Sequence, residues 1–87
     1  MEANKIIITG AATRMGAAIA KKLSGPGVEM VIHYNKSKSE AEKLQKELSK
    51  NKTKVYLVKG DLAKEQDLKK IIKFSKLKLK YFDCLVN

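Results

Sequence analysis

Residues 9–16 form the segment of this chain whose residue types are best suited to bind an anion. They run Thr-Gly-Ala-Ala-Thr-Arg-Met-Gly and connect an isoleucine-rich run to a stretch with helical spacing. A glycine in such a turn lets the backbone approach a phosphate closely, and the N–H groups at the start of the following helix attract its charge. Gly10 and Gly16 are six residues apart, which is neither the GxGxxG spacing nor that of a Walker loop. The turn therefore predicts pyrophosphate binding, although glycines also occur in such turns for backbone reasons alone.

Apolar runs and helical patterns alternate along the chain. Continuous apolar runs indicate strands buried on both faces at residues 5–9, 28–33, 55–58 and 82–86. Helical spacing begins near residues 15, 39 and 64. Single helices between strands predict a parallel sheet with right-handed crossovers, in the order 3-2-1-4. The expected fold class is α/β: part of a Rossmann-type doubly wound parallel sheet, βαβαβαβ, in one domain that covers residues 1–87.

The apolar stripes of the helices predict which helix faces pack on the sheet. The stripe of the first helix consists of Met15, Ala18, Ile19 and Leu23. The stripe of the third helix, expected over about residues 64–78, consists of Leu68, Ile71, Ile72, Ser75 and Leu79.

Length and composition exclude several classes of protein. With 87 residues the chain makes one domain or a piece of one, and 44% hydrophobic residues are too many for a disordered basic tail. Cys84 is the only cysteine, which excludes a scaffold held by internal disulfides. No apolar run is long enough to span a membrane, and the first residues do not resemble a signal peptide. A cytoplasmic location is therefore expected.

The formal net charge of +10 raises the question of a polyanionic partner. Residues 69–80 contain six lysines and no acid, and such a balance can mark a protein that binds nucleic acid. Only one arginine is present and aromatic residues make up 6%, so bidentate base readers and a stacking platform are not evident. We interpret most lysines as solvated helix faces and keep a small basic nucleic-acid-binding protein as the alternative.

The glycine turn and two later segments resemble the short-chain dehydrogenase/reductase family. The family's usual turn is TGxxxGxG after an isoleucine-rich strand. Gly60, Asp61 and Leu62 are similar to the turn that carries the family's adenine-contacting aspartate. Residues 82–87, Phe-Asp-Cys-Leu-Val-Asn, are similar to the family's fourth strand, (I/L)DxLVNNAG, up to its first asparagine. The resemblance covers the whole chain and implies the cofactor-binding half of an NAD(P)-dependent oxidoreductase.

Arg14 stands where the family has its middle glycine, which makes the turn TGxxxRxG. Together with His-Tyr-Asn-Lys-Ser at residues 33–37, this pattern is similar to a pteridine-reductase-like subgroup, whose arginine lies beside the cofactor phosphates and the substrate. A cation at a helix N-terminus is unfavourable unless an anion is bound there. The cofactor-binding residues implied by the resemblance and the spacing are Gly10, Arg14, Met15, Gly16, His33, Tyr34, Asn35, Lys36, Ser37, Asp61, Leu62 and Asn87.

The end of the second strand favours NADP(H) over NAD(H). NAD-binding proteins usually place an acid about 20 residues after the glycine turn, where it accepts from the ribose 2′-hydroxyl. No acid occurs between residues 30 and 38. Asn35, Lys36 and Ser37 offer an amide, a cation and a hydroxyl, which suit a 2′-phosphate. Lys36 and Ser37 also suit the start of a helix, and both roles can hold together.

The catalytic residues that the resemblance implies are not found in this chain. The family transfers a hydride between nicotinamide and a carbonyl or imine carbon, with a tyrosine and lysine spaced as YxxxK and a serine that orients the substrate. Tyr34 and Lys38 match the letters but lie at the adenosine end. We therefore expect no catalytic residue and no metal site, and no activity in reducing a pterin or another carbonyl compound by this chain alone.

Three hypotheses about function stay open on the sequence. The first is the nucleotide-binding half of an NADP-dependent reductase, truncated after its fourth strand. In that case, residues 82–86 would form an exposed apolar edge that pairs with the missing half or with another copy. The second is a small basic nucleic-acid-binding protein. The third is the non-functional product of a truncated gene.

Overall fold

The computed structural model describes residues 4–10, 13–81 and 84–86, and the side chain of Cys84 is outside this description. Strands and helices alternate along this part of the chain. The strands are β1 (Lys5–Ile8), β2 (Glu29–Tyr34), β3 (Lys54–Lys59) and β4 (Cys84–Val86). The helices are α1 (Arg14–Leu23), α2 (Lys38–Lys50) and α3 (Glu65–Leu79). The predicted start of the fourth strand, at residues 82–83, lies outside the described residues.

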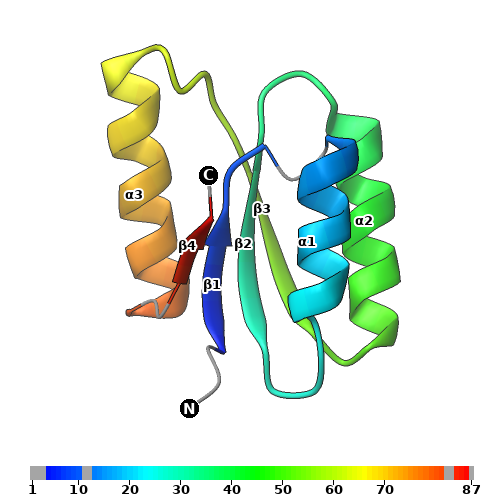
Figure 1. Cartoon of the computed structure of the whole chain (residues 1–87). Helices are drawn as coiled ribbons and strands as arrows, with labels where there is room; N and C mark the ends of the chain where they lie inside the picture. Colours follow the sequence, from blue (N-terminus) through cyan, green and yellow to red (C-terminus); the bar gives the residue numbers. More distant parts are fainter. Residues whose placement is uncertain (1–3, 11–12, 82–83, 87) are drawn as a thin grey trace.

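The strands form one parallel sheet in the order β3-β2-β1-β4, which confirms the predicted topology. The helices α1 and α2 cover one face of this sheet and α3 covers the other (Figure 1). Every connection therefore runs from the carboxyl end of one strand, through a helix, to the amino end of the next. Since β2 and β4 lie on opposite sides of β1, the strand order reverses at β1.

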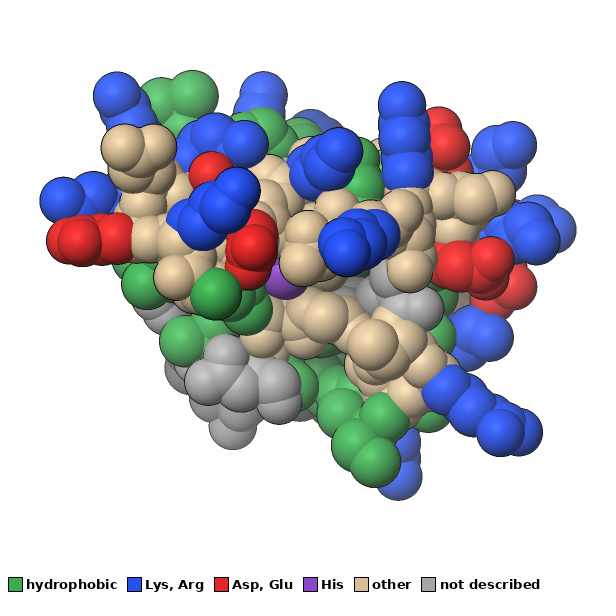
Figure 2. Space-filling model, turned by 90° about the horizontal axis from the view of Figure 1, so that it is seen from above, with side chains coloured by type: hydrophobic (Ala, Val, Ile, Leu, Met, Phe, Trp, Pro, Cys, Tyr) green, Lys and Arg blue, Asp and Glu red, His purple; other side chains and the backbone are tan. Residues whose placement is uncertain are grey.

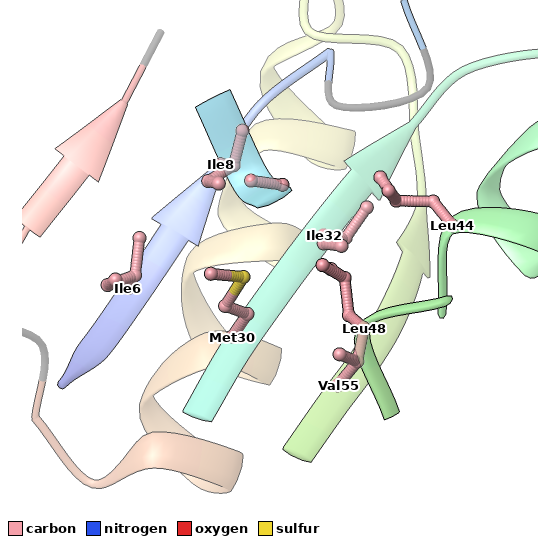
Figure 3. Close-up of a cluster of buried hydrophobic side chains, with 8 residues drawn as sticks. Ile6, Ile8, Met30, Ile32, Leu44, Leu48 and Val55 are labelled. Atoms are coloured by element: carbon pink, nitrogen blue, oxygen red, sulfur yellow. The ribbon is translucent and has the colours of Figure 1, made fainter. Parts of the chain in front are cut away.

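The core is divided between the two faces of the sheet, because neighbouring residues of each strand point to opposite faces. Beneath α1 and α2, the cluster of buried side chains consists of Ile6, Ile8, Ala20, Met30, Ile32, Leu44, Leu48 and Val55, most of which are labelled in Figure 3. Beneath α3, the cluster consists of Ile7, Val31, Val58, Ile71 and Leu79. The prediction of strands buried on both sides is thus confirmed for β1 and β2, whereas β3 is only partly buried and Leu85 of β4 is exposed.

The buried face of α1 differs from the predicted stripe. Gly16 and Ala20 are buried, whereas Met15 is 75% exposed and Ala18 is also exposed. Small residues let α1 lie close to the sheet, where close packing leaves little room for a long side chain. The predicted stripe is therefore wrong for Met15 and Ala18, whereas Ile19 and Leu23 are half-buried and Leu23 packs against the core.

The predicted stripe of α3 is only partly buried. Ile71, Ser75 and Leu79 face the sheet, but Leu68 and Ile72 are 41% and 45% exposed. The helix packs against β2 and β3, so the part of its apolar arc that points toward β4 is not covered in the described structure. Among the described residues, none of the helices is both long and apolar enough to cross a bilayer.

Candidate functional site

The turn after β1 is organised by Thr13, a residue that the sequence analysis did not single out. Thr13 is the N-cap of α1, and its Oγ1 accepts a hydrogen bond from the Gly16 N–H at 3.1 Å. The same hydroxyl donates to the Gly10 carbonyl at 2.8 Å, and the Thr13 N–H donates to that carbonyl at 3.1 Å. A threonine three residues before Gly16, at the start of helical spacing, was the available signal. The turn and the first turn of α1 are thus joined by one side chain.

Gly10 has a φ of +65°, in the left-handed region that side chains other than glycine rarely adopt. A Cβ at Gly10 would meet no atom within 4 Å, so the space around the residue does not require glycine. The glycine is therefore required by the backbone angle, and this angle turns the chain from β1 toward α1.

His33, at the carboxyl end of β2, contacts the ends of both neighbouring strands. The Gly10 N–H donates to His33 Nδ1 at 3.2 Å, and His33 Nε2 lies 2.7 Å from the carbonyl oxygen of Gly60, just after β3. The side chain is nearly enclosed, with the residue 3% exposed. One imidazole thus connects the glycine turn to the loop that follows β3.

A hollow of about 420 Å³ opens at the carboxyl ends of β1 and β4. Its lining includes the apolar residues Ile8, Ile19 and Val86. Five of the predicted cofactor-binding residues line it: Gly10, Met15, Gly16, His33 and Leu62. Met15 does not pack against the sheet and instead lines this hollow.

Arg14 is exposed and lies apart from this hollow. It lines a second hollow of about 340 Å³ between α1 and α2, together with Lys21, Lys43 and two glutamates. One of these, Glu47, forms an ion pair with Lys21 at 2.9 Å between Nζ and Oε2. The first turn of α1 contains no acidic residue to balance the arginine charge. The two hollows share Thr13 at the N-cap of α1, and contact of Arg14 with cofactor phosphates stays a prediction.

The loop between β2 and α2 carries the residues predicted to bind a 2′-phosphate. Asn35, Lys36 and Ser37 are all exposed. Ser37 occupies the N-cap position of α2, where its carbonyl accepts from Ala41 N–H at 3.0 Å, but its hydroxyl makes no capping hydrogen bond. The Ser37 backbone therefore begins the helix, and its hydroxyl is not used to cap the helix.

Of the other predicted residues, Tyr34 is buried, with 8% of its surface exposed. The Asp61 carboxylate accepts from the Ala63 N–H at 2.9 Å, which shapes the loop before α3, and its own N–H donates to Asp67 Oδ2 at 2.8 Å. An adenine contact by Asp61 stays a prediction. Asn87 lies outside the described residues.

An apolar groove of about 280 Å³ lies on the other side of Leu62, between α3 and β4. It is lined mainly by Ile7, Leu62, Leu68, Ile71, Ile72 and Leu85. Leu85 of β4 is 54% exposed. β4 is the last strand in the order of the described sheet, and Leu85 is the exposed apolar residue of the expected edge, of which residues 82–83 lie outside the described residues.

The basic side chains do not form one continuous patch at this end of the molecule. Figure 2 looks down on the end where β4 terminates, and the Lys and Arg side chains are scattered among acidic side chains and backbone. Exposed pairs of opposite charge account for some of them, such as Lys69 and Glu65, 3.5 Å apart on α3. In the described part of the chain, no group of three or more His, Cys, Asp or Glu side chains is placed to hold a metal ion.

The parallel sheet, its strand order and the glycine turn define a Rossmann-type α/β protein. The family model described as short chain dehydrogenase matches residues 4–87, so the chain belongs to the short-chain dehydrogenase family. This finding confirms the family that the glycine turn, Gly60–Leu62 and residues 82–87 indicated.

Solved structures agree with this assignment. A short-chain dehydrogenase from Oenococcus oeni PSU-1 superposes with a TM-score of 0.84 at 30% identity, over 97% of this chain and 39% of the other. The short-chain dehydrogenase/reductase of Serratia marcescens BCRC 10948 gives 0.87 at 27%, over 94% and 34%. FolM alternative dihydrofolate reductase 1 from Brucella canis, complexed with NADP, gives 0.78 at 26%, over 92% and 32%. The chain thus spans well under half the length of each of these proteins.

Proposed function

We propose that this chain is the nucleotide-binding half of an NADP-dependent short-chain oxidoreductase. The observation that carries the proposal is the hollow at the carboxyl end of β1, lined by Gly10, Gly16 and Met15. In open α/β sheets, ligands bind outside the carboxyl ends of the strands, at the point where the strand order reverses. That point is β1 here, and the N-terminus of α1 offers its N–H groups to an anion at the same place.

The choice of NADP(H) is supported by the loop between β2 and α2. Its exposed residues Asn35, Lys36 and Ser37 include a cation and a hydroxyl that is not used as a helix cap, and no acid occurs between residues 30 and 38. A lysine ammonium and a serine hydroxyl are suitable donors to a phosphate monoester. The Brucella canis relative, which is complexed with NADP, supports the same choice.

A pterin is the substrate class that we propose for the complete enzyme. The support is the TGxxxRxG turn with Arg14, which resembles the pteridine-reductase-like subgroup, and the likeness to an alternative dihydrofolate reductase. Other carbonyl or imine substrates are the alternative.

A cytoplasmic location belongs to the same proposal, and a chain with a single cysteine suits a reducing compartment.

We further propose that this chain alone does not catalyse reduction. Its tyrosines are Tyr34, Tyr56 and Tyr81, and only Tyr34 has a lysine four residues later. Tyr34 is buried, so it is a poor candidate for donating a proton to a substrate. The exposed apolar groove beside Leu68, Ile72 and Leu85 supports a further polypeptide segment as its cover, either the carboxy-terminal half or a second copy.

The test of cofactor binding is retention of the purified chain on a 2′,5′-ADP matrix, followed by calorimetric titration with NADP and with NAD. We expect retention, elution by NADP, and an affinity for NADP at least about tenfold higher than for NAD, since a phosphate hydrogen-bonded to a cation contributes on this scale. Equal affinities or a preference for NAD would contradict the proposal. Salt-sensitive binding to duplex DNA without dinucleotide affinity would favour the nucleic-acid alternative.

The test of inactivity is an NADPH-oxidation assay with a pterin and with a simple carbonyl compound. We expect no turnover above the rate without protein. Turnover by this polypeptide alone would refute the proposal that its catalytic residues lie elsewhere.

A further inference from the structure

His33 has a geometry that determines where its proton lies. The backbone N–H of Gly10 can only donate, so His33 Nδ1, 3.2 Å away, must accept with its lone pair. The carbonyl of Gly60 can only accept, so Nε2, 2.7 Å away, must carry the hydrogen. The ring is therefore neutral and in its Nε2–H form. An imidazolium would instead place an N–H group against the Gly10 N–H.

The hydrogen bond from Gly10 to His33 has a consequence for the glycine turn. Both polar groups of Gly10 are used inside the protein, since its N–H donates to His33 and its carbonyl accepts from Thr13 at 2.8 Å. The Gly10 N–H is therefore not available to a bound anion, which N–H groups at the N-terminus of α1 would hold. Gly10 is anchored on two sides, and the anchors set the direction in which the chain enters α1.

We propose that His33 is a positioning residue for the dinucleotide site: as a neutral acceptor it holds the Gly10 N–H and so keeps the turn in its anion-binding shape. The inference rests on the proposed function, because it takes the turn as the phosphate site. Burial supports it, since a 3% exposed imidazole between two backbone groups has little freedom to move. The role differs from a contact with adenosine, which would depend on the outer surface of the ring.

Two conservative variants separate the two hydrogen bonds of the ring. In His33→Asn, the amide oxygen can take the place of Nδ1 and accept from Gly10, while the bond to Gly60 is lost. In His33→Gln, the amide nitrogen can take the place of Nε2 and donate to Gly60, while the Gly10 N–H loses its acceptor. Each variant thus removes one hydrogen bond of the same pair.

The expected result is that His33→Asn binds NADP within about threefold of the wild-type chain, whereas His33→Gln binds about tenfold more weakly, the usual effect of one unsatisfied buried donor. Thermal unfolding of both variants is measured alongside, because a merely structural role would lower the two midpoints and the two affinities together. Equal affinities in the two variants, or weaker binding in His33→Asn, would overturn the inference.

Two spectroscopic measurements test the hydrogen bond from Gly10 to His33 in the absence of cofactor. Their outcome can therefore be distinguished from a failure of the proposed function. In the ¹⁵N NMR spectrum of the imidazole, we expect Nε2 protonated and Nδ1 unprotonated. We also expect the Gly10 amide to be protected from hydrogen exchange in the wild-type chain and in His33→Asn, and to exchange faster in His33→Gln. A protonated Nδ1, or equal exchange in both variants, would overturn the positioning role. A wild-type chain that shows these signatures but binds no dinucleotide would refute the proposed function, and with it the role in a dinucleotide site, and would leave only the hydrogen bond from Gly10 to His33 established.

Discussion

The Thr13→Ala substitution tests whether one hydroxyl holds the glycine turn and α1 together. The hydroxyl accepts from the Gly16 N–H at 3.1 Å and donates to the Gly10 carbonyl at 2.8 Å. Alanine removes both bonds but leaves the backbone bond from the residue 13 N–H to the same carbonyl, at 3.1 Å. The side chain is exposed, so the substitution creates no internal cavity.

The expected loss of stability follows from these contacts. Replacing a threonine N-cap by alanine costs typically about 1 kcal/mol. The lost bond to Gly10 adds little, because its carbonyl keeps a backbone donor and can reach water. The sum is about 1 to 1.5 kcal/mol in the free energy of unfolding, or a drop of roughly 5 to 10 °C in Tm for a domain of this size.

The assay is urea and thermal unfolding of the wild-type chain, Thr13→Ala and the matched control Thr13→Ser. Serine keeps the hydroxyl and is expected to remain within about 0.5 kcal/mol of wild type. If alanine and serine lower the stability equally, the lost methyl group and not the hydroxyl is responsible, and the reasoning is wrong. No change with alanine would likewise show that the turn does not depend on this residue.

Three further substitutions address the core, the loop after β3 and the cofactor. Leu48→Ala is expected to lower the free energy of unfolding by about 2 to 5 kcal/mol in urea titrations, because this leucine of α2 is fully buried in the core. Gly60→Val is expected to cost about 1 to 3 kcal/mol in the same assay, because a Cβ there would lie 2.9 Å from Ile71 Cδ1. Lys36→Glu is expected to weaken NADP binding by about tenfold or more, with no loss of NAD binding, in calorimetric titrations.

Each of these substitutions has a matched control in the chain. Leu77→Ala removes an exposed leucine, 73% of which is accessible, and should change stability by less than about 0.5 kcal/mol. Gly25→Val makes the same substitution where a Cβ would meet no atom within 4 Å. Lys73→Glu makes the same charge change on an exposed position of α3. If a control variant lost as much stability or NADP affinity as its test variant, the explanation given for that test variant would be wrong. The explanation at stake is burial for Leu48, steric conflict for Gly60 and phosphate contact for Lys36.

The strands could be predicted closely because their signal is local. Ile6, Ile7 and Ile8 form a continuous β-branched run, and the structure divides them between the two faces of the sheet, as a two-sided burial requires. The parallel sheet followed from the alternation of strands and helices, and the order β3-β2-β1-β4 is that of the Rossmann type among the doubly wound orders that such an alternation allows. The glycine turn was located by the same alternation.

The candidate site was predicted less completely. Gly10, Met15 and Gly16 line the hollow at the end of β1, whereas Arg14 lines the hollow between α1 and α2, and binding of a cofactor by any of them stays a prediction. Thr13 was missed although a helix-capping signal was present. The position of Arg14 could not be read from spacing, because adjacent residues at a helix start point in directions about 100° apart and only packing selects which one faces the ligand.

The amino-acid sequence by itself determined the α/β class, the parallel order of the strands, the family and the place of the glycine turn. The strands, the helices and the glycine turn depend on residues that are close in the chain, and the family and the strand order on how these segments follow one another. Only the tertiary structure decided which face of α1 is buried and how His33 connects Gly10 to Gly60. These contacts join residues more than twenty positions apart, and they exist only once β1, β2 and β3 lie side by side.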